Sequence, residues 1–483
     1  MHTFIQTTLY VGHPRSDPPS LNIVSSDQDA KHFLVFSYPA FGHVTPLLEL
    51  SRRIVAAGHR VTFAVSESLM DDMYKRNVVV PADEKRIRLF LLKDGIQSSH
   101  DECLSADDLV LVSNRLSVAI RDLISSLPVK STRNGYSRRI ADIPSVDVII
   151  SDVFICDAPF TAAVEQNIPI FGFSPMAGFM AMQYLGVTEQ TALGNEDVKG
   201  EMKTDQLPAG LKDKYLKIRK SLAKATGLMF NSFTGLEPNI RGEVLKLCPE
   251  FTKLKIGCVG PVVAHSPDDP MKHSETSQVS RWLDKQKERS VVYVSFGSML
   301  APKENQLLIL CETLRAMNRP FIWALKSAYQ APLSQGVKEA IKSQFQTTGC
   351  PFLILAWAPQ TTILKHKATR LFVSHCGWNS TLEGISFGVP ILAWPMCADQ
   401  HGNAEMVERL GCGKKIKNVD MAAKRIVSQE ELTGLIDEVA QWDSSLSENT
   451  YFTKAQKLSE DGAEVTSKDG DSQKNLELIL QGD

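Results

Sequence analysis

The sequence lacks the apolar segments that membrane and secreted proteins carry. Although 43% of its 483 residues are hydrophobic, no run of about 18 consecutive apolar residues occurs, which excludes a membrane-spanning helix. Residues 1–31 do not join a basic start to a continuous apolar stretch, so they do not resemble a secretory signal. We therefore expect a cytoplasmic protein without a membrane anchor.

An excess of charge and an organised set of cysteines are missing as well. Lys and Arg number 53 against 55 Asp and Glu, a formal net charge of −2, so no basic field indicates nucleic-acid binding. The nine cysteines are scattered, odd in number and without metal-ligand spacing, which gives no sign of a disulfide framework or a zinc site. We expect reduced, mostly buried thiols.

What the chain does have is a regular alternation of short β-branched runs and helical patterns. Residues 32–39 predict a strand, and Thr45 is expected to cap a helix that has Pro46 in its first turn. That helix is expected to stop at Gly58, and a second strand follows at 60–66. Such a βαβ unit indicates a parallel sheet covered by helices.

The same alternation continues to the end of the chain, with one interruption. Further strands are expected at 146–154, 227–233, 290–298, 319–325, 351–357, 370–375 and 389–395. A segment rich in Pro, Ser, His and Asp separates two of them and indicates a linker. We predict two tandem doubly wound α/β domains with the site in the cleft between them. The boundaries are a flexible extension 1–31, an N-terminal domain 32–257, a linker 258–280, a C-terminal domain 281–460 and a helix 461–483 that packs back on the N-terminal domain.

The segment 357–400 carries the chemistry of an anion site. It predicts a strand, a tight turn containing Gly377, and a helix whose N-terminus favours negative charge. A glycine in that turn lets main-chain N–H groups approach a ligand closely. His375, Asn379 and Ser380 can add donors to the same anion.

Other side chains of the same segment suit the remaining parts of a sugar nucleotide. Glu383 is placed to accept from ribose hydroxyls, and Trp357 offers a flat face to a base. Asp399 and Gln400 follow the next strand and can hold sugar hydroxyls. Each feature alone is as common in protein cores as in sites, and it is the ordered set that indicates a sugar-nucleotide site.

These 44 residues resemble the signature segment of plant-type family 1 UDP-glycosyltransferases. The family pattern runs W-x-P-Q, L-x-H, H-C-G-W-N-S, E, G-V-P and D-Q, and the sequence matches it at every point. The resemblance extends in order and spacing from about residue 32 to the end. It implies the GT-B fold, in which two Rossmann-like domains face each other and the C-terminal domain holds a UDP-sugar.

The resemblance also implies roles for single residues. Uracil would stack on Trp357, Ala358 and Gln360 would line the base and ribose pocket, and Glu383 would bind the ribose. Gln400 at the last position favours glucose as the sugar. The residues expected at the diphosphate are His375, Gly377, Asn379, Ser380 and Ser298, and those expected at the sugar are Trp378, Asp399 and Gln400.

A histidine with a near-neutral pKa is the natural base for activating an acceptor hydroxyl. His43, in the segment PAFGHVTP, follows the first strand and should face the cleft. Asp152, at the end of a strand predicted to lie near the first, would hold the imidazole, as the aspartate of a Ser-His-Asp triad does. The family's G-H-x-x-P and D-x-F patterns match both residues, and Asp157 is the fallback partner.

The resulting prediction is an inverting displacement that gives a β-glycoside and UDP. No metal or other cofactor is expected, because the helix terminus can neutralise the leaving diphosphate and no compact Asp-x-Asp cluster lies near the segment. We expect the acceptor pocket at loops 95–120 and 174–210, with Ser174 and Met176 as contacts and a surface suited to flat, apolar ligands. A flavonoid or other phenolic would fit the family, and we expect a monomer.

Three other functions stay open at this stage. A GT-B relative could act on the UDP-sugar itself as an epimerase or a hydrolase. A catalytically silent UDP-sugar-binding protein would not need His43 and Asp152 together. A nicotinamide dehydrogenase also has tandem α/β domains, but no G-x-G-x-x-G follows any predicted strand.

Overall fold

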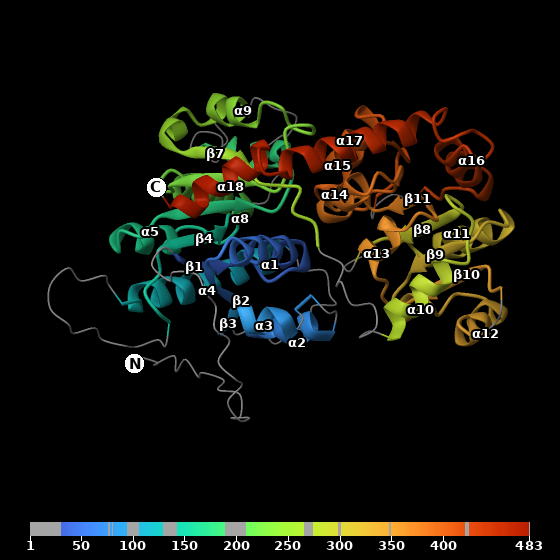
Figure 1. The fold of residues 1–483 in the computed structure, drawn as a ribbon, viewed down its shortest axis with the longest axis horizontal. Coiled ribbons are helices and arrows are strands. Elements are labelled where there is room, and N and C mark those ends of the chain that lie inside the picture. The colour runs from blue at the N-terminus through green and yellow to red at the C-terminus, as the bar shows by residue number, and fades with distance from the viewer. Residues whose placement is uncertain are drawn as a thin grey trace.

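The computed structural model describes most of the chain and builds it from two parallel sheets side by side (Figure 1). The ranges described are 30–75, 78–79, 81–93, 106–128, 143–188, 209–264, 274–297, 301–346, 349–420 and 425–482. The extension 1–31 that the sequence predicts falls almost wholly outside them, as do large parts of the expected acceptor loops. Within the described ranges, none of the helices is both long and apolar enough to cross a membrane.

The N-terminal sheet has seven strands in the order β3-β2-β1-β4-β5-β6-β7. Its strands are β1 (His32–Phe36), β2 (Arg60–Ser66), β3 (Ile87–Leu92), β4 (Val148–Asp152), β5 (Ile170–Ser174), β6 (Gly227–Phe230) and β7 (Lys255–Cys258). The helices around it are α1 (Phe41–Ala56), α2 (Glu67–Lys75), α3 (Pro81–Arg86), α4 (Ala106–Ser126), α5 (Ala158–Glu165), α6 (Gly178–Leu185), α8 (Ala209–Leu222) and α9 (Ile240–Leu247). The central strands are buried on both faces, as a helix-covered parallel sheet requires.

The C-terminal sheet has six strands in the order β10-β9-β8-β11-β12-β13. Its strands are β8 (Val291–Ser295), β9 (Phe321–Ala324), β10 (Phe352–Leu355), β11 (Thr369–Ser374), β12 (Ile391–Ala393) and β13 (Gly413–Lys415). The helices are α10 (Ser274–Leu283), α11 (Glu304–Ala316), α12 (Gln335–Ser343), α13 (Gln360–Lys365), α14 (Trp378–Ser386), α15 (Gln400–Arg409), α16 (Gln429–Ala440), α17 (Thr450–Thr466) and α18 (Asp471–Gln481). Both sheets are wholly parallel, so the predicted α/β fold class is confirmed.

Every strand expected from the sequence is present, but β3, β5, β7 and β13 were not predicted. Three of these four lie at sheet edges, where one side faces away from the core and a continuous apolar run is not needed. The central strand β5 contains Gly172, whose missing side chain makes room for Leu222. Edge position accounts for the short strands β7 and β13, whereas β3 (IRLFLL) carries an apolar run that the prediction missed.

The start of α1 differs from the prediction. The helix begins at Phe41 with Ala40 as N-cap, so Thr45 is inside it and is not the capping residue. Pro46 also lies inside α1 and not in its first turn. The end is as expected, because Gly58 takes the left-handed conformation (φ 93°) just after the helix. His43 consequently lies in the first turn of α1.

The C-terminal helices join the two halves of the molecule. Helix α17 packs on α14 of the second sheet, and α18 packs on β7 of the first (Figure 1). Asn475 of α18 donates a hydrogen bond of 2.8 Å to the carbonyl of Cys258. Helix α10 begins at Ser274, inside the range 258–280 that the sequence predicts as linker, and residues 265–273 lie outside the described residues.

Candidate active site

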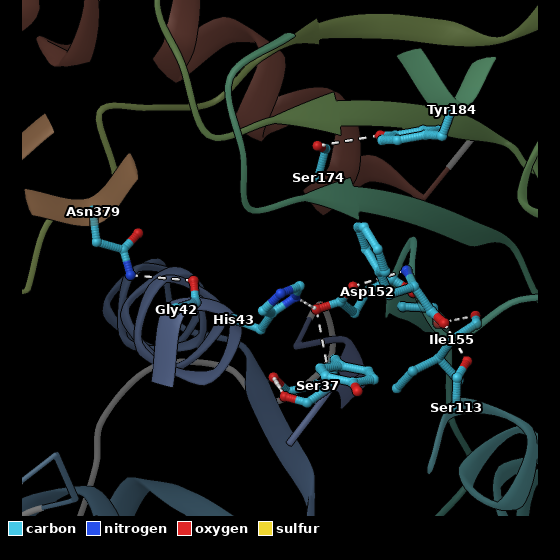
Figure 2. A network of polar contacts seen from close by, with 12 residues as sticks. Ser37, Gly42, His43, Ser113, Asp152, Ile155, Ser174, Tyr184 and Asn379 are labelled. Atoms are coloured by element: carbon cyan, nitrogen blue, oxygen red, sulfur yellow. Dashed lines mark hydrogen bonds and ion pairs between the residues drawn. The ribbon is translucent and has the colours of Figure 1, made fainter. Parts of the chain in front are cut away.

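The first turn of α1 presents His43 at the carboxyl edge of the N-terminal sheet. Strands β1 and β4 are parallel neighbours with Phe36 opposite Ser151, so the turn after β1 and the last residue of β4 lie at one edge. That last residue is Asp152. His43 Nδ1 lies 2.8 Å from Asp152 Oδ2, and Figure 2 shows the imidazole directed at the carboxylate.

The pairing fixes which nitrogen of the imidazole carries hydrogen. A carboxylate only accepts, so Nδ1–H of His43 donates to Asp152 and Nε2 keeps the free lone pair. The Asp152 side chain is 0% exposed, whereas 18% of the His43 side chain is open to solvent. A fully buried carboxylate thus holds Nδ1 of a partly exposed imidazole, whose Nε2 is left to accept a proton. This is the geometry of a general base with its orienting partner.

Main-chain donors make the buried carboxylate tolerable. Phe154 N–H donates to Asp152 Oδ1 at 2.9 Å, and Tyr38 N–H lies 3.4 Å from Oδ2. A carboxylate without such partners would be costly to bury. The rings of the same two residues also pack against the imidazole, with Tyr38 and Phe154 centroids 5.1 Å and 5.3 Å from that of His43. The ring of His43 is therefore held by two aromatic contacts as well as at Nδ1.

The fallback partner and the acceptor residues lie elsewhere. Asp157 is exposed, has φ 71° and precedes α5, and its N–H donates to Ser221, so Asp152 and not Asp157 partners His43. Ser174 is fully buried and accepts a hydrogen bond of 3.3 Å from the Tyr184 hydroxyl (Figure 2). Ser174 as an acceptor contact therefore stays a prediction, and in this structure its side chain is enclosed by protein. Met176 is partly buried against the N-terminal core.

The turn that the sequence predicts to bind an anion lies between β11 and α14. Gly377 is the N-cap of α14, which begins at Trp378, and Gly388 follows its end with φ 63°. Gly377 also has a second purpose that the sequence does not show. A Cβ on Gly377 or on Gly297 would meet Nε2 of His375 at 2.6 Å or 2.5 Å, so the His375 ring fits between two glycines. Burial lowers the pKa of His375 to about 4, so the ring is neutral at pH 7.

A hydrogen-bond network organises the pocket expected to hold the ribose. Gln360 Nε2 donates to Glu383 Oε2 at 2.6 Å and to Ser380 Oγ at 3.0 Å. The Tyr293 hydroxyl donates to Gln360 Oε1 at 3.0 Å, a contact that sequence spacing gives no means of finding. Burial raises the pKa of Glu383 to about 7, and the Gln360 hydrogen bond opposes that rise.

Two residues of α14 form hydrogen bonds with the N-terminal half. The indole N–H of Trp378 donates to the carbonyl of Asn231 at 2.7 Å, so the buried Trp378 side chain joins the two halves. The sugar contact that the sequence predicts for Trp378 would therefore have to come from its main-chain N–H. Asn379 Nδ2 donates to the carbonyl of Gly42 at 3.1 Å (Figure 2). Pro46 has no N–H, and this leaves the Gly42 carbonyl without its partner inside α1.

The remaining residues of the segment lie around α14. Trp357 is two positions past the end of β10 and 39% exposed, as a stacking surface requires, while Ala358 is buried behind it. Gln400 Oε1 accepts from the N–H groups of Met396 and Cys397 and so shapes the loop before α15. Asp399 accepts from Asn403 at 2.9 Å, and burial raises its pKa. Ser298 lies outside the described residues.

Acidic and metal-ligating side chains do not gather around these residues. In the part of the chain that the structure describes, no three His, Cys, Asp or Glu side chains lie together as metal ligands would. The site thus consists of a His-Asp pair from one sheet and a helix N-terminus with neutral donors from the other.

Comparison with known proteins agrees with this geometry. The family model for UDP-glucoronosyl and UDP-glucosyl transferases matches residues 244–441. UDP-glycosyltransferase 71C3 of Arabidopsis thaliana is 30% identical over 83% of this chain and 88% of its own length. Flavonol 3-O-glucosyltransferase UGT71C1 of the same plant is 29% identical over 85% and 89%.

Solved structures share the whole fold. A UDP-glucosyltransferase from Polygonum tinctorium superposes with a TM-score of 0.73 at 26% identity, covering 94% of this chain and 98% of that one. The two parallel sheets, the turn before α14 and the sequence relatives therefore agree. This chain belongs to the plant family 1 UDP-glycosyltransferases and is a GT-B enzyme that uses a UDP-sugar.

Proposed function

We propose that the enzyme transfers glucose from UDP-glucose to a hydroxyl of a small phenolic acceptor, with inversion at the anomeric carbon. The observation that carries the proposal is the 2.8 Å contact between His43 and Asp152 at the edge of the cleft. In this proposal Nε2 of His43 removes the acceptor proton while the acceptor oxygen attacks the anomeric carbon. Asp152 stabilises the imidazolium that forms.

The nature of the acceptor rests on relatives and on the surroundings of His43. One relative is named a flavonol 3-O-glucosyltransferase, and the Polygonum enzyme is described as capable of glucosylating indoxyl. The partly buried ring of Phe154 packs against the imidazole here, so a flat aromatic acceptor would have an aromatic neighbour next to the base. Gln400 supports glucose as the sugar.

The leaving diphosphate is proposed to be neutralised without a metal ion. The first main-chain N–H groups of α14 have no partners inside the helix, and a helix N-terminus favours a negative charge such as that of a diphosphate. Neutral His375 and Asn379 can add hydrogen bonds. We further propose that the enzyme works as a monomer in the cytoplasm, which size-exclusion chromatography and cell fractionation would test.

UDP release from UDP-glucose, with and without a panel of phenolic acceptors, tests the proposal. Release that depends on acceptor, with a product heavier by one hexosyl unit and a β-configured linkage by NMR, is the expected result. Release without any acceptor would indicate a hydrolase or an epimerase instead. Saturable UDP binding, without UDP release in the presence of any acceptor of the panel, would contradict either a phenolic acceptor or UDP-glucose as the donor.

A further inference from the structure

A lysine lies buried behind the catalytic pair, where the mechanism gives it no task. Lys214 of α8 is 4% exposed, and Nζ donates to the carbonyl of Phe154 at 2.6 Å and to the hydroxyl of Ser113 on α4. The Ser113 hydroxyl donates to the same carbonyl (Figure 2). Burial of an ammonium group this far from water is costly unless the group is paired or hydrogen-bonded. The presence of a lysine at this position therefore suggests that it has a task.

The residue that Lys214 holds is the one that supports the His43–Asp152 pair. Phe154 donates its N–H to Asp152 Oδ1, packs the edge of its ring against His43, and offers its carbonyl to Lys214. Only one residue therefore separates the buried cation from the carboxylate. Burial lowers the pKa of Lys214, and the nearby Asp152 is one of the groups that oppose this shift. The two charged groups are therefore close enough to interact.

The rest of the loop after β4 is fixed from the same two helices. Ser117, one turn after Ser113 on α4, donates to the carbonyl of Cys156 at 2.9 Å. Ser221 of α8 accepts from the N–H of Asp157 at 2.6 Å. Loop 153–157 is thus held by side chains from both helices, and Lys214 is the charged group among them.

We propose that Lys214 is a positioning residue that sets the geometry of the His43–Asp152 pair through Phe154. The charge-assisted bond to the Phe154 carbonyl fixes that residue, which contacts both the carboxylate and the imidazole. Lys214 touches neither donor nor acceptor, and its effect falls on the orientation of the base. This inference rests on the proposed role of His43 as general base.

Replacement of Lys214 by Met removes the charge at nearly constant volume. We expect kcat to fall between about tenfold and a hundredfold, because small misplacements of a catalytic group have effects of that size. The Kd for UDP should not change, because the UDP site belongs to the other sheet. The matched control is Lys217→Met on the same helix, whose side chain is 42% exposed and pairs with Asp213, and it should keep the wild-type kcat.

Rescue separates positioning by charge from simple packing. In Lys214→Ala, n-propylammonium should restore part of the lost kcat and n-propanol should not. A wild-type kcat in Lys214→Met, or equal rescue by both compounds, would overturn the proposal. Should the Lys214 variants fail to fold, Ser113→Ala is the test, because it keeps the cation but removes the second donor to the Phe154 carbonyl. A lower kcat with unchanged UDP affinity would then support the inference, and an unchanged kcat would overturn it.

The proposed function fails in a different way from this inference. If His43 is not the base, His43→Ala keeps its turnover, or the wild-type enzyme shows no acceptor-dependent UDP release. A failure confined to Lys214 leaves both of those results as expected.

Discussion

Glu383 carries the clearest titration of any donor-site residue. Burial raises its pKa to about 7, so without ligand it is close to half protonated at neutral pH. Ribose hydroxyls donate to an ionised carboxylate more strongly than to a protonated one. Ligand binding therefore favours the ionised form, which is present above pH 7 and is lost as the pH falls through that value.

UDP-glucose affinity should consequently weaken in acid. From about pH 8 to about pH 6 we expect the Kd to rise up to about tenfold, measured by calorimetry, because the ionised fraction of Glu383 falls by that factor one pH unit below its pKa. UDP-glucose is the suitable probe because its phosphates do not titrate in this range. The Glu383→Gln variant should bind more weakly at every pH and lose the dependence, and an equal dependence in both proteins would contradict this assignment.

Asp152 decides which tautomer of His43 is present. In Asp152→Asn the amide can donate toward Nδ1, which moves the imidazole hydrogen to Nε2 and removes the lone pair that accepts the acceptor proton. We expect kcat to fall by about 10²–10⁴ with little change in the KM for UDP-glucose. Steady-state kinetics at saturating acceptor would check this, and a kcat near the wild-type value would show that the carboxylate is only structural.

Contacts between single residues can be predicted from the sequence where strand ends bring the residues together. His43 and Asp152 are 109 positions apart, yet His43 follows β1 and Asp152 ends β4, and the carboxyl ends of these neighbouring parallel strands share an edge. The Tyr293–Gln360 bond and the Lys214–Phe154 bond depend on how side chains pack between distant elements. No periodicity in the sequence reports such contacts, so they could not be predicted.

Pro46 allows helix α1 to form a hydrogen bond with helix α14 of the other half. Without an N–H at position 46, the Gly42 carbonyl next to His43 is free to accept from Asn379 of α14. Helix α1 of one half and α14 of the other are therefore coupled beside the base. The sequence predicts Pro46 only as a first-turn residue, because the helix was expected to start later.

A double-mutant cycle tests this coupling. In Pro46→Ala the new N–H should take the Gly42 carbonyl, so that Asn379 loses its partner. Asn379→Ala should then cost about 1 kcal/mol less unfolding free energy in the Pro46→Ala background than in the wild type, a difference typical of one hydrogen bond. Chemical denaturation measures both values, and additive effects would refute the coupling.

The boundaries of the elements were harder to predict than their existence. The strands expected from β-branched runs are present, while edge strand β13, with the sequence GKK, gives no apolar signal. The cap of α1 was misplaced because Thr45 and Pro46 together imitate a helix start, whereas Ala40 begins the helix without a side-chain cap. Main-chain geometry after β1 decides that start, and capping preferences are too weak to override it.

The whole molecule divides its chemistry between two sheets. The N-terminal sheet carries the His-Asp pair, the C-terminal sheet carries the helix N-terminus proposed to hold the diphosphate, and α17 and α18 join them (Figure 1). This division predicts that donor binding and base catalysis can be disturbed separately. Variants on the N-terminal sheet should change kcat, and variants around α14 should change donor affinity.

Neutralisation of the leaving group by protein dipoles makes a prediction for the intact enzyme. Prolonged treatment with EDTA, followed by transfer into metal-free buffer, should leave kcat unchanged if main-chain N–H groups and neutral side chains hold the diphosphate as proposed. Added Mg²⁺ should not raise the rate beyond the effect of ionic strength. Loss of activity with EDTA and its recovery with a divalent ion would contradict a metal-independent mechanism.

The role of His43 is the central claim, and one variant tests it most directly. Acceptor-dependent UDP release from UDP-glucose should be compared between the wild type and His43→Ala, with UDP binding measured for both by calorimetry. We predict a rate lower by about 10²–10⁴ in His43→Ala with UDP affinity retained, since the base is lost and the donor site is not touched. Turnover at the wild-type rate in a variant that still binds UDP would contradict the account.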